Sequence, residues 1–203
     1  SPNGAGKSTL IGRLLGLLRP TSGTATVFGL DVRRDAAAVH RRLAYVPSGA
    51  NLWPSLTGAE TLEFLGNVHG SVDAGYRSEL VERFQLAPDK KVRAYSHGNK
   101  QKVLLIAAFA SRADLLLLDE PTAGLDPDSS DGFVALLRSL HRDLALTVIM
   151  VTHDLDTLFE LSTRIAVLAD QRVIVNGRPR EVIAYRHPFV EAFFLGERGQ
   201  RAM

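Results

Sequence analysis

The first nine residues constrain this chain more than any other stretch, and they read Ser-Pro-Asn-Gly-Ala-Gly-Lys-Ser-Thr. The pattern G-x-x-x-x-G-K-[S/T] is typical of a loop that binds phosphate and leads into a helix. Gly6, Lys7 and Ser8 match this pattern, and Ser1 stands where the first glycine would be. Small residues let successive backbone N–H groups face one anion, and the helix adds the positive end of its dipole. We therefore expect this segment to bind a polyphosphate.

Two side chains of the segment have chemical roles of their own. Lys7 is expected to bring a positive charge to the outer phosphates, and the Ser8 hydroxyl to bind Mg²⁺. A glycine-rich turn before an ordinary helix is the alternative interpretation. Because a strand normally precedes such a loop and directs it, we also expect the N-terminal strands of the fold to be missing from the chain.

Composition narrows the class of protein. A chain of 203 residues with 45% hydrophobic content can form one substantial core, with room for a small helical subdomain. It has no cysteine, which excludes disulfides and thiolate metal sites and suits a reducing compartment such as the cytoplasm. The formal charge of +2, with both signs mixed along the chain, does not favour nucleic-acid binding. No apolar run approaches the roughly 20 residues that span a bilayer, so we expect any membrane link to run through a partner.

Hydrophobic periodicity predicts alternating helices and strands. Leucines between residues 10 and 18 predict a helix that packs on a sheet and ends before Pro20. Thr57 and Glu60 have the spacing of a capping box, so a helix should begin there and carry Leu62, Phe64 and Leu65 inward. Further helices are expected at 36–42, within 71–93, and at 96–110, 127–141, 155–161, 179–185 and 189–194. Strands are expected at 24–28, 43–46, 115–118, 147–151, 164–169 and 172–176.

Two carboxylates follow the most hydrophobic of the predicted strands. Residues 115–118 are all leucine, as expected of a central parallel strand, and Asp119 and Glu120 come next. Ligands bind at the carboxyl ends of the strands in open α/β sheets. We expect Asp119 to hold Mg²⁺, and Glu120 to orient and polarise an attacking water. The alternative is a pair of structural carboxylates.

Two more polar turns are candidate anion sites. Ser96-His97-Gly98-Asn99 opens an apolar helix, and its N-terminus can bind an anion or can simply be capped by Ser96. The residues alone favour neither interpretation. His153 follows the strand predicted at 147–151, where it could donate a hydrogen bond to a terminal phosphate. Trp53 is expected either in the core or on a loop that contacts a partner.

Five motifs in this order closely resemble the nucleotide-binding subunit of ABC transporters. They lie at residues 4–9, 96–99, 117–122, 124–126 and 152–154, and the resemblance covers nearly the whole chain. It implies a P-loop NTPase fold of the ABC ATPase type, which is an α/β fold with a parallel sheet core. It further implies one domain over 1–203 with a helical subdomain at about 57–112, and it favours the anion-binding role for Ser96.

The resemblance also implies a mechanism. Two subunits would face each other head to tail, with each ATP between the phosphate loop of one and the signature turn of the other. Nucleotide would be bound by Asn3, Gly4, Ala5, Gly6, Lys7, Ser8, Thr9, Ser96, Gly98, Asn99 and Asp126, with Asp126 in the loop that links the two sites. His153 would be the switch histidine, and Glu120 would direct hydrolysis. ATP and Mg²⁺ are the implied cofactors. The implied partner is a transmembrane permease, with this subunit in the cytoplasm and peripheral on the cytoplasmic face of the cell membrane.

The chain departs from the family pattern at three places. The signature Leu-Ser-Gly-Gly-Gln reads Tyr95-Ser96-His97-Gly98-Asn99, which keeps the serine and one glycine. Ser48 replaces the glutamine that helps to bind Mg²⁺ and senses the permease. The aromatic residue that stacks on adenine in the family would lie before Ser1. We retain Ser96 and its backbone as the contact, and Ser48 as a metal ligand.

Two stretches bear on the transported substrate. Residues 52–58 resemble ATPases of bacterial drug or small-molecule exporters, whereas residues 187–199 resemble ATPases of phospholipid-trafficking systems. We favour export of drug-like or lipid molecules, because the first stretch faces the membrane partner in the family. A non-hydrolysing or soluble ABC-type regulatory protein without a membrane partner is the alternative, and a kinase or GTPase is a more distant one.

Overall fold

The computed structural model describes residues 6–49, 51–70, 72–123, 125–144 and 146–194. The chain forms two compact units. Residues 37–150 make up the central unit, and residues 1–36 together with 151–203 make up the terminal unit. In the described part of the chain, no helix combines the length and the apolar character that crossing a membrane requires.

A three-stranded sheet forms the core of the central unit. Its strands are β3 (Leu43–Val46), β4 (Leu115–Asp119) and β5 (Thr147–Val151), in the order β3-β4-β5. β3 and β4 are parallel, and Leu43 pairs with Leu115 while Val46 pairs with Leu118. The leucines of β4 are all buried, as predicted for a central strand. At the end of β5 the chain passes into the terminal unit.

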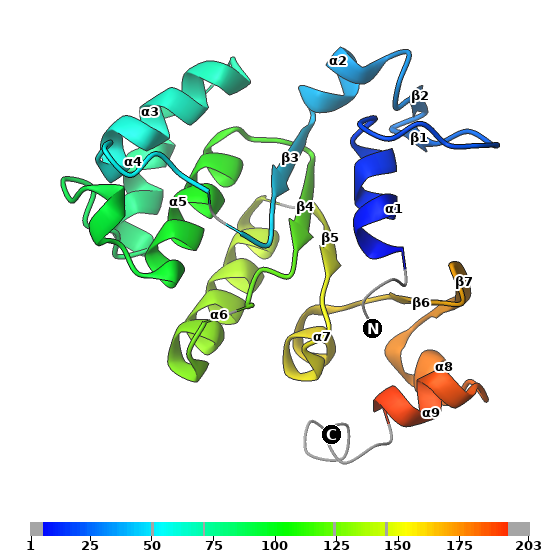
Figure 1. The fold of residues 1–203 in the computed structure, drawn as a ribbon. Coiled ribbons are helices and arrows are strands. Elements are labelled where there is room, and N and C mark those ends of the chain that lie inside the picture. The colour runs from blue at the N-terminus through cyan, green and yellow to red at the C-terminus, as the bar shows by residue number, and fades with distance from the viewer. Residues whose placement is uncertain (1–5, 50, 71, 124, 145, 195–203) are drawn as a thin grey trace. The chain divides into compact units, whose positions relative to one another are not determined.

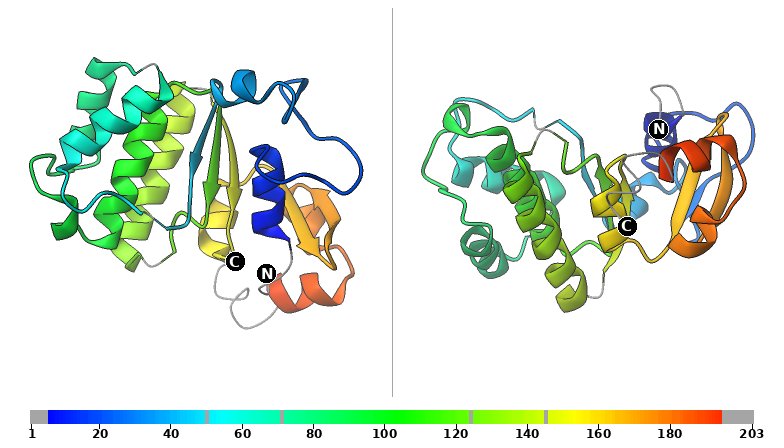
Figure 2. Two further views of the ribbon diagram at one scale, coloured as in Figure 1. Left: turned by 45° about the horizontal axis from the view of Figure 1, so that its top comes forward. Right: turned by 90° about the horizontal axis from the view of Figure 1, so that it is seen from below.

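The long helices of the central unit lie on one side of this sheet (Figures 1 and 2). They are α3 (Gly58–His69), α4 (Ala74–Arg83), α5 (His97–Ala110) and α6 (Pro127–Leu144). The short helix η1 (Val92–Ala94) lies between α4 and α5, and the short helix α2 (Ala36–His40) precedes β3. α5 packs against β3, α3 and α4. Buried residues of α4 and α5 include Leu80, Leu105 and Phe109, so these helices share one apolar core with the sheet.

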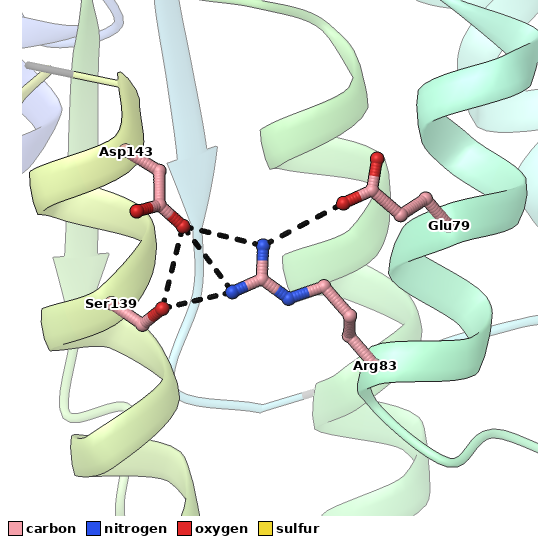
Figure 3. Close-up of polar contacts among 4 residues, drawn as sticks. All are labelled: Glu79, Arg83, Ser139 and Asp143. Atoms are coloured by element: carbon pink, nitrogen blue, oxygen red, sulfur yellow. Dashed lines mark hydrogen bonds and ion pairs between the residues drawn. The ribbon is translucent and has the colours of Figure 1, made fainter.

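A cluster of polar side chains joins α4 to α6 (Figure 3). One guanidinium nitrogen of Arg83 lies 3.3 Å from a carboxylate oxygen of Asp143 and donates to the Ser139 hydroxyl at 2.8 Å. Glu79, one turn before Arg83 on α4, lies 3.8 Å from the other terminal nitrogen. The contacts of Arg83 with Ser139 and Asp143 join residues 56 and 60 positions apart, and nothing in the sequence pattern indicated them.

The terminal unit combines the two ends of the chain. It contains α1 (Lys7–Leu14), the pair β1 (Thr26–Val27) and β2 (Leu30–Asp31), α7 (Leu155–Leu161), β6 (Ile165–Ala169), β7 (Arg172–Gly177), α8 (Pro179–Ile183) and α9 (Pro188–Phe194). β6 and β7 form an antiparallel hairpin, and α8 packs against both strands and α9. Leu155 of α7 is buried with Ile165, Val182 and Phe194, so α7 is anchored to this hairpin layer.

The first helix is shorter than the leucine pattern predicted. α1 ends at Leu14, and Gly16 turns the chain with a φ of +69°. A Cβ at Gly16 would lie 2.3 Å from the carbonyl oxygen of Val32, so only glycine fits this turn. The prediction that the helix runs on through the last leucines is therefore wrong, and Leu17 is 73% exposed.

Two further predictions need correction. The strand predicted at 24–28 is only two residues long, and its partner β2 was not predicted at all. Phe64 does not point inward, because 44% of it is exposed and its ring meets that of Trp53 edge to face at 4.6 Å. Both errors have the same cause: a short hydrophobic run reports apolar character but not which neighbours will cover it.

Candidate functional site

The N-terminus of α1 in the terminal unit has the local form of an anion-binding helix start. Gly6 stands at the N-cap with a φ of 90°, a left-handed conformation that glycine adopts at little cost. No side chain among the described residues caps this end, and the first turn holds no acidic residue. Lys7 and Ser8 are the first two helical residues, and Ser8 is exposed. The positive end of the helix is thus left for an anion.

The rest of the predicted phosphate loop is described only in part. Thr9 is exposed in the first turn of α1. Asn3, Gly4 and Ala5 lie outside the described residues. Their assignment to nucleotide therefore stays a prediction from the motif.

His153 lies in a turn between β5 and α7 that its neighbours hold in place. The backbone N–H of Asp154 donates to the Thr152 hydroxyl at 3.0 Å, and the Asp154 carboxylate caps α7 by accepting from the N–H of Asp156. His153 itself is exposed. The turn therefore presents an imidazole at the surface of the terminal unit.

Asp119 in the central unit ends the buried strand β4. Leu118 before it is fully buried, whereas Asp119 is half-buried, so its carboxylate lies where the strand leaves the core. The negative charge of this carboxylate affects the pKa of Tyr45 on β3. Burial is the main cause that raises the pKa of Tyr45, and the negative charge of Asp119 raises it further. A carboxylate in this position can hold a cation.

Glu120 has a backbone conformation that a residue other than glycine rarely adopts. Its φ is 47°, in the left-handed region, and its carbonyl accepts a hydrogen bond from Ala123 at 3.0 Å to close a turn. Such conformations cost roughly 1–3 kcal/mol and concentrate at functional sites. The sequence identified the residue, but it gave no sign of this strain.

Ser96 acts as the N-cap of α5, which is the simpler of its two interpretations. Its hydroxyl accepts a hydrogen bond from the Asn99 N–H at 3.2 Å, and Ser96 remains exposed. Gly98 is closely packed, since a Cβ there would lie 3.2 Å from a methyl of Leu125. Asp126 is exposed just before α6 begins. The cap does not remove the predicted nucleotide role of Ser96, Gly98, Asn99 and Asp126, which stays a prediction.

The predicted magnesium ligands are Ser8 in the terminal unit and Asp119 and Ser48 in the central unit. Their donor atoms are all oxygens, the ligands that Mg²⁺ prefers, and the ion commonly takes its other ligands from phosphate and water. Ser48 is exposed in the loop after β3. Within the described residues, no group of three or more histidine, aspartate or glutamate side chains could hold a metal alone. The chemistry of each residue suits Mg²⁺, and their joint assignment to one ion stays a prediction.

The fold and these local geometries define a class of protein, an α/β nucleotide-binding domain of the phosphate-loop type. Residues 2–123 match the family described as ABC transporter. The chain therefore belongs to the ABC transporter family.

Solved structures confirm the fold. The chain superimposes on cbiO1 from Clostridium perfringens, part of the ABC transporter complex cbiONQ, with a TM-score of 0.78 and 28% sequence identity. That match covers 91% of this chain and 77% of cbiO1. A dimeric ATP-binding cassette, MJ0796 bound to ADP and Pi, matches with a TM-score of 0.75 and 26% identity, over 87% of this chain and 82% of the cassette. The fold is that of an ABC ATPase, as the sequence predicted.

Curated relatives are longer than this chain. The daunorubicin/doxorubicin resistance ATP-binding protein DrrA of Streptomyces peucetius is 41% identical over 89% of the chain. The methionine import ATP-binding protein MetN of Mesorhizobium japonicum is 34% identical over 96% of the chain. The chain spans 56% of the length of each. Relatives named for resistance and for import thus share this domain.

Proposed function

We propose that this chain binds and hydrolyses ATP as the nucleotide-binding subunit of an ABC transporter, and so drives substrate movement through a separate permease. The observation that carries the proposal is Glu120, a carboxylate held in a strained turn directly after the buried strand β4. Strain of this kind is retained where a side chain must be aimed, and an ATPase needs a carboxylate aimed at water. Membership of the family supports the same reaction.

Each candidate residue has a distinct role in this proposal. Lys7 and the backbone of residues 3–9 bind the phosphates, together with the positive end of α1. Glu120 orients the attacking water and polarises it, and His153 donates a hydrogen bond to the terminal phosphate. Ser8, Asp119 and Ser48 would hold Mg²⁺, which would supply positive charge beside the phosphates.

The active form in this proposal is a head-to-tail dimer. Ser96, Gly98 and Asn99 of one subunit contact the ATP bound by the other, and Asp126 lies in the loop that links the two sites. The support comes from the dimeric cassette with ADP and Pi, which shares this fold, and from the exposed N-terminus of α5. ATP closes the dimer, and hydrolysis opens it.

The proposed partner is a transmembrane permease, with this subunit peripheral on the cytoplasmic face of the membrane. Trp53 and Phe64 support a docking role for the start of the helical segment, because their rings pack together while each stays more than 40% exposed. Exposed aromatic pairs of this kind are common contact points in protein interfaces. A soluble regulatory protein with the same fold remains the alternative function.

Export is the proposed direction of transport. It rests on residues 52–58, which resemble exporter ATPases, and on the resistance function for which DrrA is named. The similarity of residues 187–199 to phospholipid-trafficking ATPases adds lipids to the candidate substrates. MetN, which is named for import, is less similar in sequence to this chain. Drug-like or lipid molecules are therefore the proposed cargo.

Nucleotide binding can be tested through the helix start of α1. We expect Lys7→Ala to raise the Kd for MgATP at least about tenfold, since it removes a positive charge from the phosphate site. Lys90→Ala is the matched control, because Lys90 is an exposed lysine outside the proposed site. Isothermal titration would give both values. Equal affinity of the two variants would contradict the proposed site.

A further inference from the structure

Thr157 is a buried polar residue one helical turn beyond the turn that carries His153. It is only 2% exposed, although threonine is usually found at the surface. Its hydroxyl donates a hydrogen bond to the carboxylate of Asp154. Leu155, between the two, is buried in the apolar cluster of β6, α8 and α9. Burial and this hydrogen bond therefore hold the Thr157 side chain in one position within the terminal unit.

Asp154 connects the buried Thr157 to the turn that carries His153 through its own hydrogen bonds. One of its carboxylate oxygens accepts from the backbone N–H of Asp156 at 3.3 Å, and the other accepts from Thr157. The backbone N–H of Asp154 donates to the Thr152 hydroxyl. His153 lies between Thr152 and Asp154 in the chain, and these two residues are joined by that hydrogen bond. Three hydrogen bonds thus define the backbone from which the imidazole projects.

We infer that Thr157 is a positioning residue for His153, acting through the carboxylate of Asp154. The inference rests on the proposed function, in which His153 contacts the terminal phosphate of ATP. Without the Thr157 hydroxyl, one Asp154 oxygen loses its buried donor and the carboxylate is free to rotate. The turn then samples other conformations, and the imidazole spends less time where it can reach the phosphate. Misplacement of a reacting group by about 1 Å can cost up to a hundredfold in rate.

The chemistry of the pair explains why threonine is suited to this position. A hydrogen bond from a hydroxyl to a carboxylate is stronger than one between neutral groups. Serine can make the same bond, whereas valine has nearly the same shape as threonine but no donor. Thr157→Ser and Thr157→Val therefore separate the hydrogen bond from the packing. Thr157→Ala, which also removes the hydroxyl, replaces Thr157→Val if the latter does not fold.

The experiment measures MgATP turnover by the full chain for these variants, for His153→Ala and for the double variant His153→Ala with Thr157→Val. We expect Thr157→Val to lower kcat roughly tenfold, with KM for ATP within about twofold of the wild type. Thr157→Ser should keep nearly the wild-type rate. In the His153→Ala background, Thr157→Val should have no further effect, because the two residues act as one unit. Thermal unfolding of each variant checks that it is folded.

A readout independent of turnover completes the test. The imidazole Cε1–H resonance of His153, assigned by its loss in His153→Ala, should shift or broaden in Thr157→Val but not in Thr157→Ser. An unchanged resonance in Thr157→Val would overturn the inference, and so would an equal loss of kcat in both backgrounds. If His153→Ala kept the wild-type rate, the proposed role of His153 would fail instead, while the resonance would still test the positioning.

Discussion

Glu120 shows how one residue can carry both the chemistry and a local cost in stability. Its left-handed backbone is unfavourable for any residue with a Cβ, by roughly 1–3 kcal/mol. Glycine would remove that strain but would also remove the carboxylate. The proposed function therefore requires the less stable choice at this position, a known compromise between stability and activity.

This compromise can be measured by comparing two substitutions of Glu120. Both Glu120→Gly and Glu120→Ala remove the carboxylate, but only glycine relieves the left-handed backbone. We expect the free energy of unfolding of Glu120→Gly to exceed that of Glu120→Ala by about 1 kcal/mol. Chemical denaturation of the two variants gives the difference directly. A less stable glycine variant would show that the backbone at this position is not strained.

At single residues, the sequence predicted chemistry better than conformation. Asp119, Glu120 and His153 could be selected because polar residues follow apolar strands. The positive φ of Glu120 could not be predicted, since it depends on the turn that follows β4. The hydrogen bond from Thr157 to Asp154 has one weak indication in the sequence, an aspartate at the N-cap of a helix with a hydroxyl residue three positions later.

Among the elements, α3 begins where the capping-box pattern predicted. The Thr57 hydroxyl accepts from the Glu60 N–H at 3.1 Å, and the Glu60 carboxylate accepts from the Thr57 N–H at 2.7 Å. The hydrogen bond from the Thr57 N–H is the main cause that lowers the pKa of Glu60. A lowered pKa in the folded state means that this carboxylate stabilises the protein above the ordinary glutamate pKa of 4.5.

The capping box therefore makes thermal stability depend on pH in a defined direction. We expect Glu60→Gln to lower the midpoint of thermal unfolding at pH 7, with the difference from wild type shrinking as the pH falls through the folded pKa of Glu60. Glu63→Gln is the matched control, because Glu63 is exposed on α3 outside the first turn. Calorimetry at several pH values measures both. A difference that grows toward acidic pH would contradict the assignment.

The contact between α4 and α6 makes a second prediction for the elements. Arg83 is 30% exposed and Asp143 is 51% exposed, so solvent screens the pair and its energy is small. A double-mutant cycle with Arg83→Gln and Asp143→Asn should give a coupling of about 0.5 kcal/mol that falls as salt is added. The cycle of Arg83 with Glu79, at 3.8 Å, should give less. Equal coupling in the two cycles would contradict the geometry.

Sequence periodicity predicted an element well where all its side chains are buried. It predicted poorly where contacts between residues distant in sequence determine the end or the packing of an element. β4 was correct because four successive leucines favour a strand covered on both faces, and all four are buried. The end of α1 was wrong because Gly16 fits against the carbonyl of Val32, a contact that periodicity does not contain. The ion pair of Arg83 was missed for the same reason, since its partner is distant in sequence.

At the scale of the whole molecule, the proposed ATPase requires more than one chain. The signature turn at Ser96 is proposed to act on ATP held by a second subunit. We expect Glu120→Gln, which would bind ATP but not hydrolyse it, to form a dimer in MgATP that is detectable by sedimentation velocity. The same variant should stay monomeric in MgADP. A monomer at saturating MgATP would contradict the head-to-tail arrangement.

The most direct test of the central claim is steady-state release of phosphate from MgATP by the wild-type chain and by Glu120→Gln. The account predicts turnover by the wild type and a loss of about 10²-fold or more in the variant, because glutamine cannot act as a base toward water. ATP binding by the variant should be retained, which separates lost chemistry from lost affinity. Equal turnover by the two proteins would show that Glu120 does not direct hydrolysis.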